Sequence, residues 1–182
     1  NLEKDLINVG VVNQTTMLAS ETKDIINLFT KTFEEIYGKN SVSNHIINTR
    51  DTLCYATNEN QESTLNLLKE DVDLSIIVGG YNSSNTSHLT ELSNKKIKTF
   101  FINSADKISM NNNIVHFDLK TKREIKTKKF LPQKKCKIIL TSGASCPDVI
   151  LENIMIKIAL IKKIELNKNK ILEKVNLKYS SK

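Results

Sequence analysis

The chain contains no tryptophan, and aromatic residues make up only 5% of its 182 residues. Hydrophobic residues account for 39%, which is enough for a core, so isoleucine and leucine must supply most of the packing. The three cysteines, Cys54, Cys136 and Cys146, form no close pair. This pattern excludes a disulfide framework and a CxxC zinc site, and it favours a reducing compartment. No uninterrupted apolar stretch is long enough to span a bilayer, so we expect no membrane association.

Acidic residues are the other shortage. The 27 lysines and arginines exceed the 20 aspartates and glutamates, which gives a net charge of +7 and a pI of about 9.2. Such a surface suits an acidic protein or a phosphorylated substrate. The lysine-rich runs at 126–137 and 162–173 are not interleaved with stacking aromatics or arginines, so we expect no nucleic acid as partner. Both runs are also compatible with a simple solvated face.

The stretch Leu74–Thr86 combines a buried strand with a polar turn. A short apolar run has the length of a fully buried strand, and the paired glycines Gly79 and Gly80 allow a sharp turn close to a ligand. Ser83, Ser84 and Asn85 then fall at the start of a helix, where free N–H groups and the helix dipole favour an anion. The stretch therefore predicts a phosphate cradle, and the alternative is an ordinary N-cap.

The same unit occurs twice more along the chain. NQTT at 13–16 follows a strand over 7–12, and SGAS at 142–145 follows a strand over 138–140. A helical pattern spans 20–37, with Ser20 as cap and an apolar stripe that includes Ile25 and Ile36. A second spans 58–69, with Leu65, Leu67 and Leu68 facing inward. A third, at 148–161, is broadly apolar and predicts a well-buried helix. A further strand spans 97–102. Alternating strands and helices predict an α/β fold with mostly parallel sheets, which bind ligands at the carboxyl ends of their strands. If the three turns converge, they form a hydroxyl-lined phosphate pocket.

Residues 104–135 alternate only weakly and indicate a loop or a peripheral ribbon without chemistry. Cys54 stands among polar residues and could be a nucleophile or a metal ligand. The three histidines have no recognisable relation to it, and we interpret them as incidental; Cys136 and Cys146 we interpret as packing residues. A single cysteine cannot hold zinc or an iron–sulfur cluster, so a metal site would need ligands from outside this chain.

Four motifs resemble those of the LytB/IspH family, the 4-hydroxy-3-methylbut-2-enyl diphosphate reductases. Thr52–Thr57 with Gln61 and Glu62 resembles the family's T-[IL]-C-x-A-T…RQ signature, and Val78–Thr86 resembles VGxxNSSN[ST]. Thr141–Asp148 resembles TAGAS-x-P-[DE], and Gln14–Thr16 resembles [QK]TT. The resemblance covers residues 10–160 and implies the C-terminal two-thirds of the enzyme, of the plastid (apicoplast) type.

The resemblance implies three similar α/β units in a pseudo-threefold arrangement around a central cluster. Residues 1–48 would form the C-terminal half of the second unit, 49–164 the third unit and 165–182 a basic tail. Cys54 would be one of three cysteine ligands of a [4Fe–4S] cluster whose fourth iron is open to substrate. The substrate diphosphate would be bound by Ser83, Ser84, Asn85 and Ser145, and Thr15 would lie near the substrate hydroxyl and position a water or proton.

The implied reaction is a reductive dehydroxylation that gives isopentenyl and dimethylallyl diphosphates, with a ferredoxin-type protein as electron donor. The family's first two cluster cysteines, its histidines and its glutamate proton donor would all precede residue 1, so we expect the chain to need an N-terminal part of the enzyme and to be inactive alone. Asn60 stands where the family has arginine, and Ser142 replaces a common alanine. The alternative function is a non-catalytic diphosphate-binding or interaction module. The composition, rich in asparagine and lysine, favours a plastid stroma, with the bacterial cytoplasm as alternative.

Overall fold

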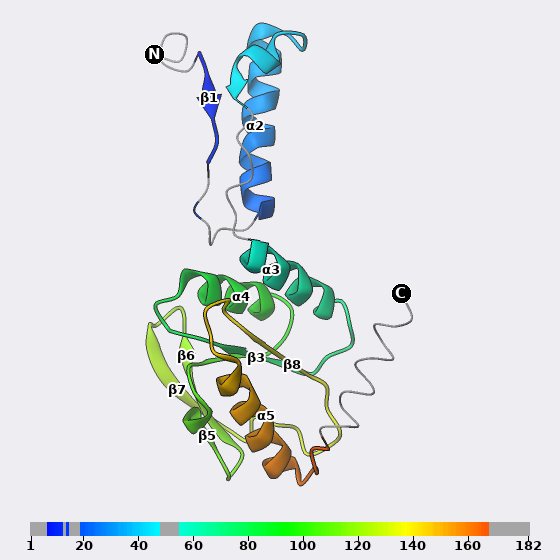
Figure 1. Ribbon diagram of the computed structural model, residues 1–182, viewed down its shortest axis with the longest axis vertical. Coiled ribbons are helices and arrows are strands. Elements are labelled where there is room, and N and C mark those ends of the chain that lie inside the picture. Colours follow the sequence, from blue (N-terminus) through cyan, green and yellow to red (C-terminus); the bar gives the residue numbers. More distant parts are fainter. Residues whose placement is uncertain (1–6, 13, 15–18, 48–54, 168–182) are drawn as a thin grey trace.

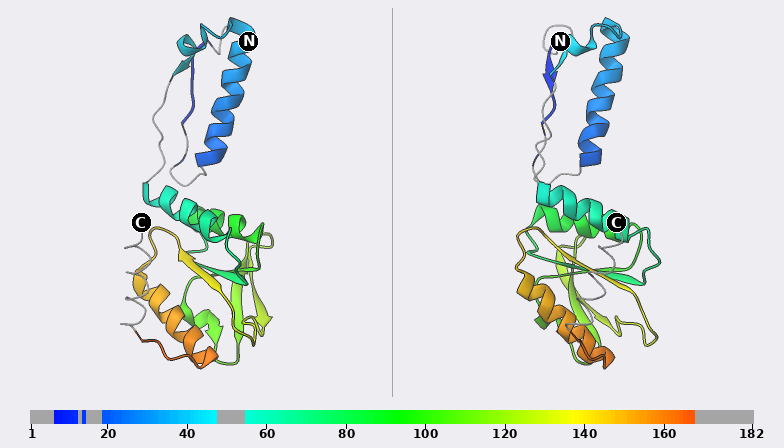
Figure 2. Two further views of the ribbon diagram at one scale, coloured as in Figure 1. Left: turned by 90° about the vertical axis from the view of Figure 1, so that its right-hand side faces the viewer. Right: turned by 45° about the vertical axis from the view of Figure 1, so that its right-hand side comes forward.

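The computed structural model describes residues 7–12, 14, 19–47 and 55–167. Two short strands, β1 (Val9–Gly10) and β2 (Ile46–Ile47), pair in parallel, with Val9 opposite Ile46. Between them the chain forms α2 (Ala19–Tyr37) and a 3-10 turn, η1 (Val42–Asn44). Figures 1 and 2 show this unit at one end of the elongated molecule, with α2 beside the strand pair. In the described part of the chain, no helix is long and apolar enough to cross a membrane.

One aromatic face holds α2 in place. Phe33 is buried, and Tyr37 stacks on the ring of His45 with the centroids 3.8 Å apart. His45 also bonds through Nδ1 to the carbonyl of Ile7 at 2.7 Å, so this histidine is structural rather than incidental. The apolar stripe predicted from the sequence is only partly right, because two of its members are exposed: Ile25 and Ile36.

The ends of α2 are set by the backbone. The helix begins at Ala19, so Ser20 lies within it, and the prediction that Ser20 caps the helix is wrong. Gly38 ends the helix: it has φ +79°, a left-handed conformation that glycine adopts without steric cost, and its N–H donates to the carbonyl of Glu34.

The larger unit is built on a three-stranded parallel sheet in the order β4 (Thr99–Ile102), β3 (Leu74–Val78), β8 (Ile138–Ser142). Two helices, α3 (Tyr55–Leu67) and α4 (Ser84–Asn94), cover one face, and α5 (Asp148–Lys162) covers the other (Figures 1 and 2). The α/β fold with parallel strands is thus as predicted from the buried apolar runs.

Residues 104–135 form an antiparallel ribbon. It comprises the turn η2 (Ala105–Lys107) and the strands β5 (Ile108–Ser109), β6 (Asn113–Asp118) and β7 (Arg123–Lys128). The ribbon was one of the two predicted forms, but it is not peripheral. Its apolar side chains are buried in the same core cluster as the β3 and β4 residues and Ile154 of α5; they are Ile108, Ile114, Phe130 and Leu131.

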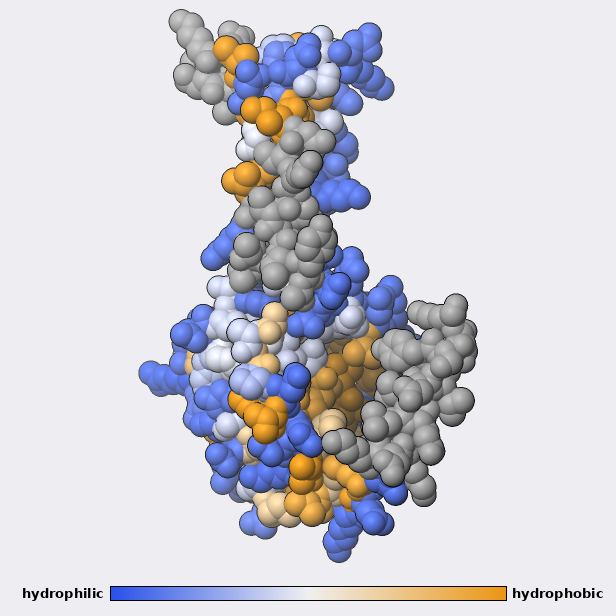
Figure 3. Space-filling view, viewed as in Figure 1, coloured by the Kyte–Doolittle hydropathy of each residue, from blue (hydrophilic) through white to orange (hydrophobic). Residues whose placement is uncertain are grey.

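The helices on the sheet bury faces other than those predicted. On α3 and the residue after it, Leu68 is buried, but Leu65 and Leu67 are exposed, and three polar side chains are buried instead: Thr57, Gln61 and Thr64. Helix α5 is not well buried on all sides, since only Ile154 and Ala159 are fully buried and several apolar residues face outward. Figure 3 shows apolar residues on the surface over this helix. Mean apolarity predicts that a helix is buried, but not on how many sides.

Candidate functional site

The candidate site lies at the carboxyl ends of β3 and β8. The two strands are parallel neighbours in register, with Val78 opposite Ser142, so the turns that follow them leave the same edge of the sheet. Each turn leads directly into a helix, α4 after β3 and α5 after β8. Two of the three hydroxyl-bearing turns predicted from the sequence are therefore adjacent. The third turn, at 13–16, follows β1 in the separate two-stranded sheet, and only Gln14 of it is among the described residues.

Ser83 is the N-cap of α4. Its Oγ accepts from the backbone N–H of Thr86 at 3.3 Å and from Thr86 Oγ1 at 3.0 Å. A serine hydroxyl has two acceptor positions and one proton to donate. Because Thr86 occupies both acceptor positions, Ser83 can offer its proton to a ligand oxygen. The N-cap interpretation and the ligand interpretation of Ser83 are therefore compatible.

Two glycines pack the turns against the same threonine. A Cβ built on Gly79 would lie 2.5 Å from Thr86 Oγ1, and one built on Gly143 would overlap the same oxygen. The N–H of Gly143 donates to the carbonyl of Val78 at 3.0 Å, which joins the end of β8 to the end of β3. The glycines allow this close approach because they have no side chain. A Cβ on Gly143 would also lie 3.8 Å from Ser83 Oγ, so the second turn lies beside the N-cap.

The buried side chain of Asn85, in the first turn of α4, makes no hydrogen bond within the described structure that would explain its burial in the folded chain. It is only 6% exposed, and neither Nδ2 nor Oδ1 has a hydrogen-bond partner among the described residues. A buried amide without partners costs about 1–3 kcal/mol per group, so such groups are rare in folded proteins. The position beside the free N–H groups of a helix start suits an anionic ligand. Ser84 and Ser145, the other predicted ligands, are both exposed.

Helix α3 adds two polar residues that the analysis of the turns missed. Asn60 Nδ2 donates to the carbonyl of Ser142 at 3.2 Å and so ties α3 to the end of β8. Gln61 is 3% exposed, and its Nε2 has no partner within the described part of the chain. The signal for both was their place in the segment that resembles the T-[IL]-C-x-A-T…RQ signature, where Gln61 matches the signature and Asn60 departs from it.

Two predicted site residues, Thr15 and Cys54, lie outside the described residues. Within the ranges that the structure describes, no group of three or more histidine, cysteine or acidic side chains could hold a metal ion. Cys146 packs against the core cluster, as predicted. Burial, and to a lesser degree Asp148, raise the pKa of its thiol, which disfavours the reactive thiolate.

A protein-family model described as LytB protein matches residues 1–159. The chain belongs to the LytB family. A 4-hydroxy-3-methylbut-2-enyl diphosphate reductase from Prochlorococcus marinus subsp. pastoris is 43% identical over 163 residues, which cover 88% of this chain and 40% of that protein. The reductase of the same name from Gloeothece citriformis is 44% identical over 161 residues, with the same coverage.

The LytB chain thus spans about two fifths of the length of these relatives, a smaller share than the two-thirds predicted from the motifs. A solved reductase structure from Plasmodium falciparum, "the E-1-hydroxy-2-methyl-but-2-enyl-4-diphosphate reductase", superposes with a TM-score of 0.56 at 23% identity. The superposition covers 84% of this chain and 39% of that one. This similarity shows that the fold is shared.

Proposed function

We propose that this LytB chain forms the diphosphate-binding part of a 4-hydroxy-3-methylbut-2-enyl diphosphate reductase, an oxidoreductase of the non-mevalonate isoprenoid pathway. The names of its relatives support the substrate class. The observation that carries the proposal is Asn85, a buried amide whose two polar atoms lack partners in the described structure, at the helix start where two glycine-containing turns meet.

Each residue of the site has a simple role toward a diphosphate. Asn85 Nδ2 donates to a phosphate oxygen in a place shielded from water, and Ser83 donates its hydroxyl proton. The N–H groups at the start of α4 and the helix dipole stabilise the negative charge. Ser84 and Ser145 donate from the exposed side, where the substrate enters. Hydrogen bonds to a charged group are about twice as strong as neutral ones, so a few such donors can hold the diphosphate without a lysine.

The redox part of the reaction involves groups outside the described residues. The described residues do not form a ligand set for a cluster. We propose Cys54 as one ligand of a [4Fe–4S] cluster, with the other cysteines supplied by an N-terminal part of the enzyme, and Thr15 as the residue that positions a water or proton. Such a cluster would supply electrons, delivered by a ferredoxin-type donor. A plastid stroma, or alternatively a bacterial cytoplasm, is the proposed location.

Asn85→Ala tests the diphosphate site in the 182-residue chain. We expect inorganic pyrophosphate to bind the variant roughly 10- to 150-fold more weakly, the factor that corresponds to the ~1.5–3 kcal/mol of a charge-assisted hydrogen bond. The free energy of unfolding should not fall, because the substitution removes two unsatisfied buried atoms. Calorimetric titration and urea unfolding measure the two quantities. Asn94→Ala, on the exposed last turn of the same helix, is the matched control.

Equal pyrophosphate affinity in N85A and the unaltered chain would contradict the proposed site. The activity itself is tested in a chimera in which this chain replaces the matching segment of the Prochlorococcus reductase, reconstituted anaerobically with iron and sulfide. Substrate-dependent electron uptake by the chimera, lost with Asn85→Ala, is the expected result. Pyrophosphate binding without electron uptake would favour the non-catalytic binding module.

A further inference from the structure

Tyr81 lies in the turn that carries the diphosphate donors, two residues before Ser83. Its ring stacks on Phe117 of β6 with the centroids 4.5 Å apart and the planes 13° from parallel. Phe101, a fully buried residue of β4, lies nearly perpendicular to the same ring, with the centroids 5.2 Å apart. Phe101 and Phe117 also contact each other, with the centroids 5.9 Å apart, so the ring of Tyr81 lies in the corner between the ribbon and the central sheet.

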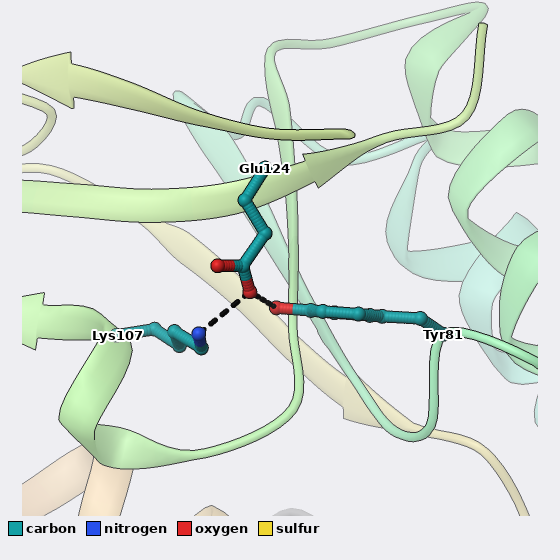
Figure 4. Close-up of polar contacts among 3 residues, drawn as sticks. All are labelled: Tyr81, Lys107 and Glu124. Carbon is teal, nitrogen blue, oxygen red and sulfur yellow. Dashed lines mark hydrogen bonds and ion pairs between the residues drawn. The ribbon is translucent and has the colours of Figure 1, made fainter. Parts of the chain in front are cut away.

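The hydroxyl of Tyr81 joins the turn to two further segments. It donates to Glu124 Oε1 at 2.7 Å, and Lys107 Nζ approaches the same carboxylate oxygen at 2.6 Å. Figure 4 shows the three side chains converging, Tyr81 from the turn after β3, Glu124 from β7 and Lys107 from η2. Burial raises the pKa of Tyr81, and the bond to Glu124 raises it further, so the phenol stays protonated and acts as the donor. The hydrogen bonds from Lys107 and Tyr81 lower the pKa of Glu124, which stays ionised as the acceptor.

The contacts among Tyr81, Glu124 and Lys107 act on the turn after β3 rather than on the stability of the whole molecule. The ion pair between Lys107 and Glu124 is partly exposed, and such pairs contribute little to global stability. The bond from Tyr81 to Glu124 connects the turn after β3 to the ribbon. The other side of this turn packs, through Thr86, against Gly79 and Gly143. The ribbon and the end of β8 thus hold the turn from two sides.

We infer that Glu124 and Lys107 are positioning residues for diphosphate binding: they fix Tyr81, and through it the backbone that presents Ser83 and Asn85. The role of the ribbon in substrate binding is to hold this turn in the conformation that binds the diphosphate, without touching the ligand. A pre-ordered turn binds more tightly because its ordering entropy does not have to be lost on binding. This inference rests on the proposed diphosphate site.

The test measures two quantities in the 182-residue chain: the affinity for inorganic pyrophosphate, and hydrogen exchange of the backbone amides at 79–86. Tyr81→Phe removes only the hydroxyl and keeps the ring contacts, and Glu124→Gln removes the charge. We expect each to weaken pyrophosphate binding about fivefold, the factor equivalent to one net hydrogen bond, and to speed exchange at 79–86. The double variant should be little weaker than the weaker of the two single variants, because both changes act on the same bond between Tyr81 and Glu124.

Glu91→Gln is the matched control, since it makes the same chemical change at an exposed position on α4. Unchanged affinity in Y81F and E124Q would overturn the inference, whether or not exchange at 79–86 increases. Additive losses in the double variant would overturn it as well. If the unaltered chain does not bind pyrophosphate, the proposed site fails; exchange at 79–86 then still reports whether the ribbon orders the turn.

Discussion

Gly143→Ala tests whether the two turns of the site pack as tightly as the structure shows. The added Cβ would overlap Thr86 Oγ1, and Thr86 is buried and bonded to Ser83 at 3.0 Å. Overpacking a buried site costs about 1–3 kcal/mol, and displacing Thr86 loses a hydrogen bond worth ~1 kcal/mol. The reduced entropy of the unfolded chain returns about 0.4–1 kcal/mol. The net loss is therefore about 1–3 kcal/mol of unfolding free energy, or roughly 2–12 °C in Tm for a chain of this size.

Two second-site variants identify the clashing atom. Thr86→Ala removes Oγ1 and leaves Thr86 Cβ at 3.6 Å and Ser83 Oγ at 3.8 Å from the new methyl group, both ordinary contacts. In that background Gly143→Ala should cost less than about 0.5 kcal/mol, which gives a coupling energy of at least ~0.5 kcal/mol. Thr86→Ser keeps Oγ1 and should not relieve the clash.

Urea unfolding followed by far-ultraviolet circular dichroism measures these differences, since the chain has no tryptophan to report by fluorescence. A Gly143→Ala variant as stable as the unaltered chain would contradict the close packing of the two turns on Thr86. Equal relief by Thr86→Ser and Thr86→Ala would refute the assignment of the clash to Oγ1.

Two further predictions follow from groups outside the turns. Burial lowers the pKa of His116 below its usual 6.5, so the unfolded chain takes up a proton at a higher pH than the folded chain. The contribution of neutral His116 to stability is complete above about pH 6.5 and declines as the pH falls toward the lowered pKa. When Tm is measured from pH 7.5 to 5.5, it should therefore fall less in His116→Gln than in the unaltered chain. Equal slopes of Tm against pH would contradict this prediction. Because the pKa of Cys146 is raised, its thiol should be alkylated by iodoacetamide at pH 7.5 more slowly than free cysteine, and Asp148→Asn should speed the reaction. Mass spectrometry of the peptide that contains Cys146 measures the rate. Alkylation faster than that of free cysteine would contradict the prediction.

The sheet and the turns of the site were predictable because their signals are local. Leu74–Val78 is a short apolar run followed by two glycines and three residues of types that favour helix starts. Each of these features determines the local structure within a few residues of its own position. A parallel arrangement follows from the alternation of strands and helices, and it brings Ser83 and Gly143 to one edge of the sheet.

Contacts between distant segments left no such signal. Tyr81 and Glu124 are 43 positions apart, and nothing in either segment indicates the other. Leu65 and Leu67 were predicted to face inward because apolar residues usually line a buried helix face. Helix α3 instead buries Gln61 and Thr64, and periodicity of apolar residues cannot detect a polar interface.

The polar side chains buried on α3 and α4 of the LytB chain differ in whether folding supplies their hydrogen-bond partners. Threonines on buried helix faces satisfy themselves locally: Thr64 donates to the carbonyl of Asn60, and Thr90 donates to that of Thr86. An amide side chain has no such local solution, because it needs both donors and acceptors from outside its own helix turn. The buried amide atoms without partners in the described structure are those of Gln61 and Asn85, on the two helices that adjoin the turns. Folding leaves these groups unsatisfied at a cost in stability. In the diphosphate site proposed above, the ligand oxygens would accept from Asn85 and recover that part of the cost on binding.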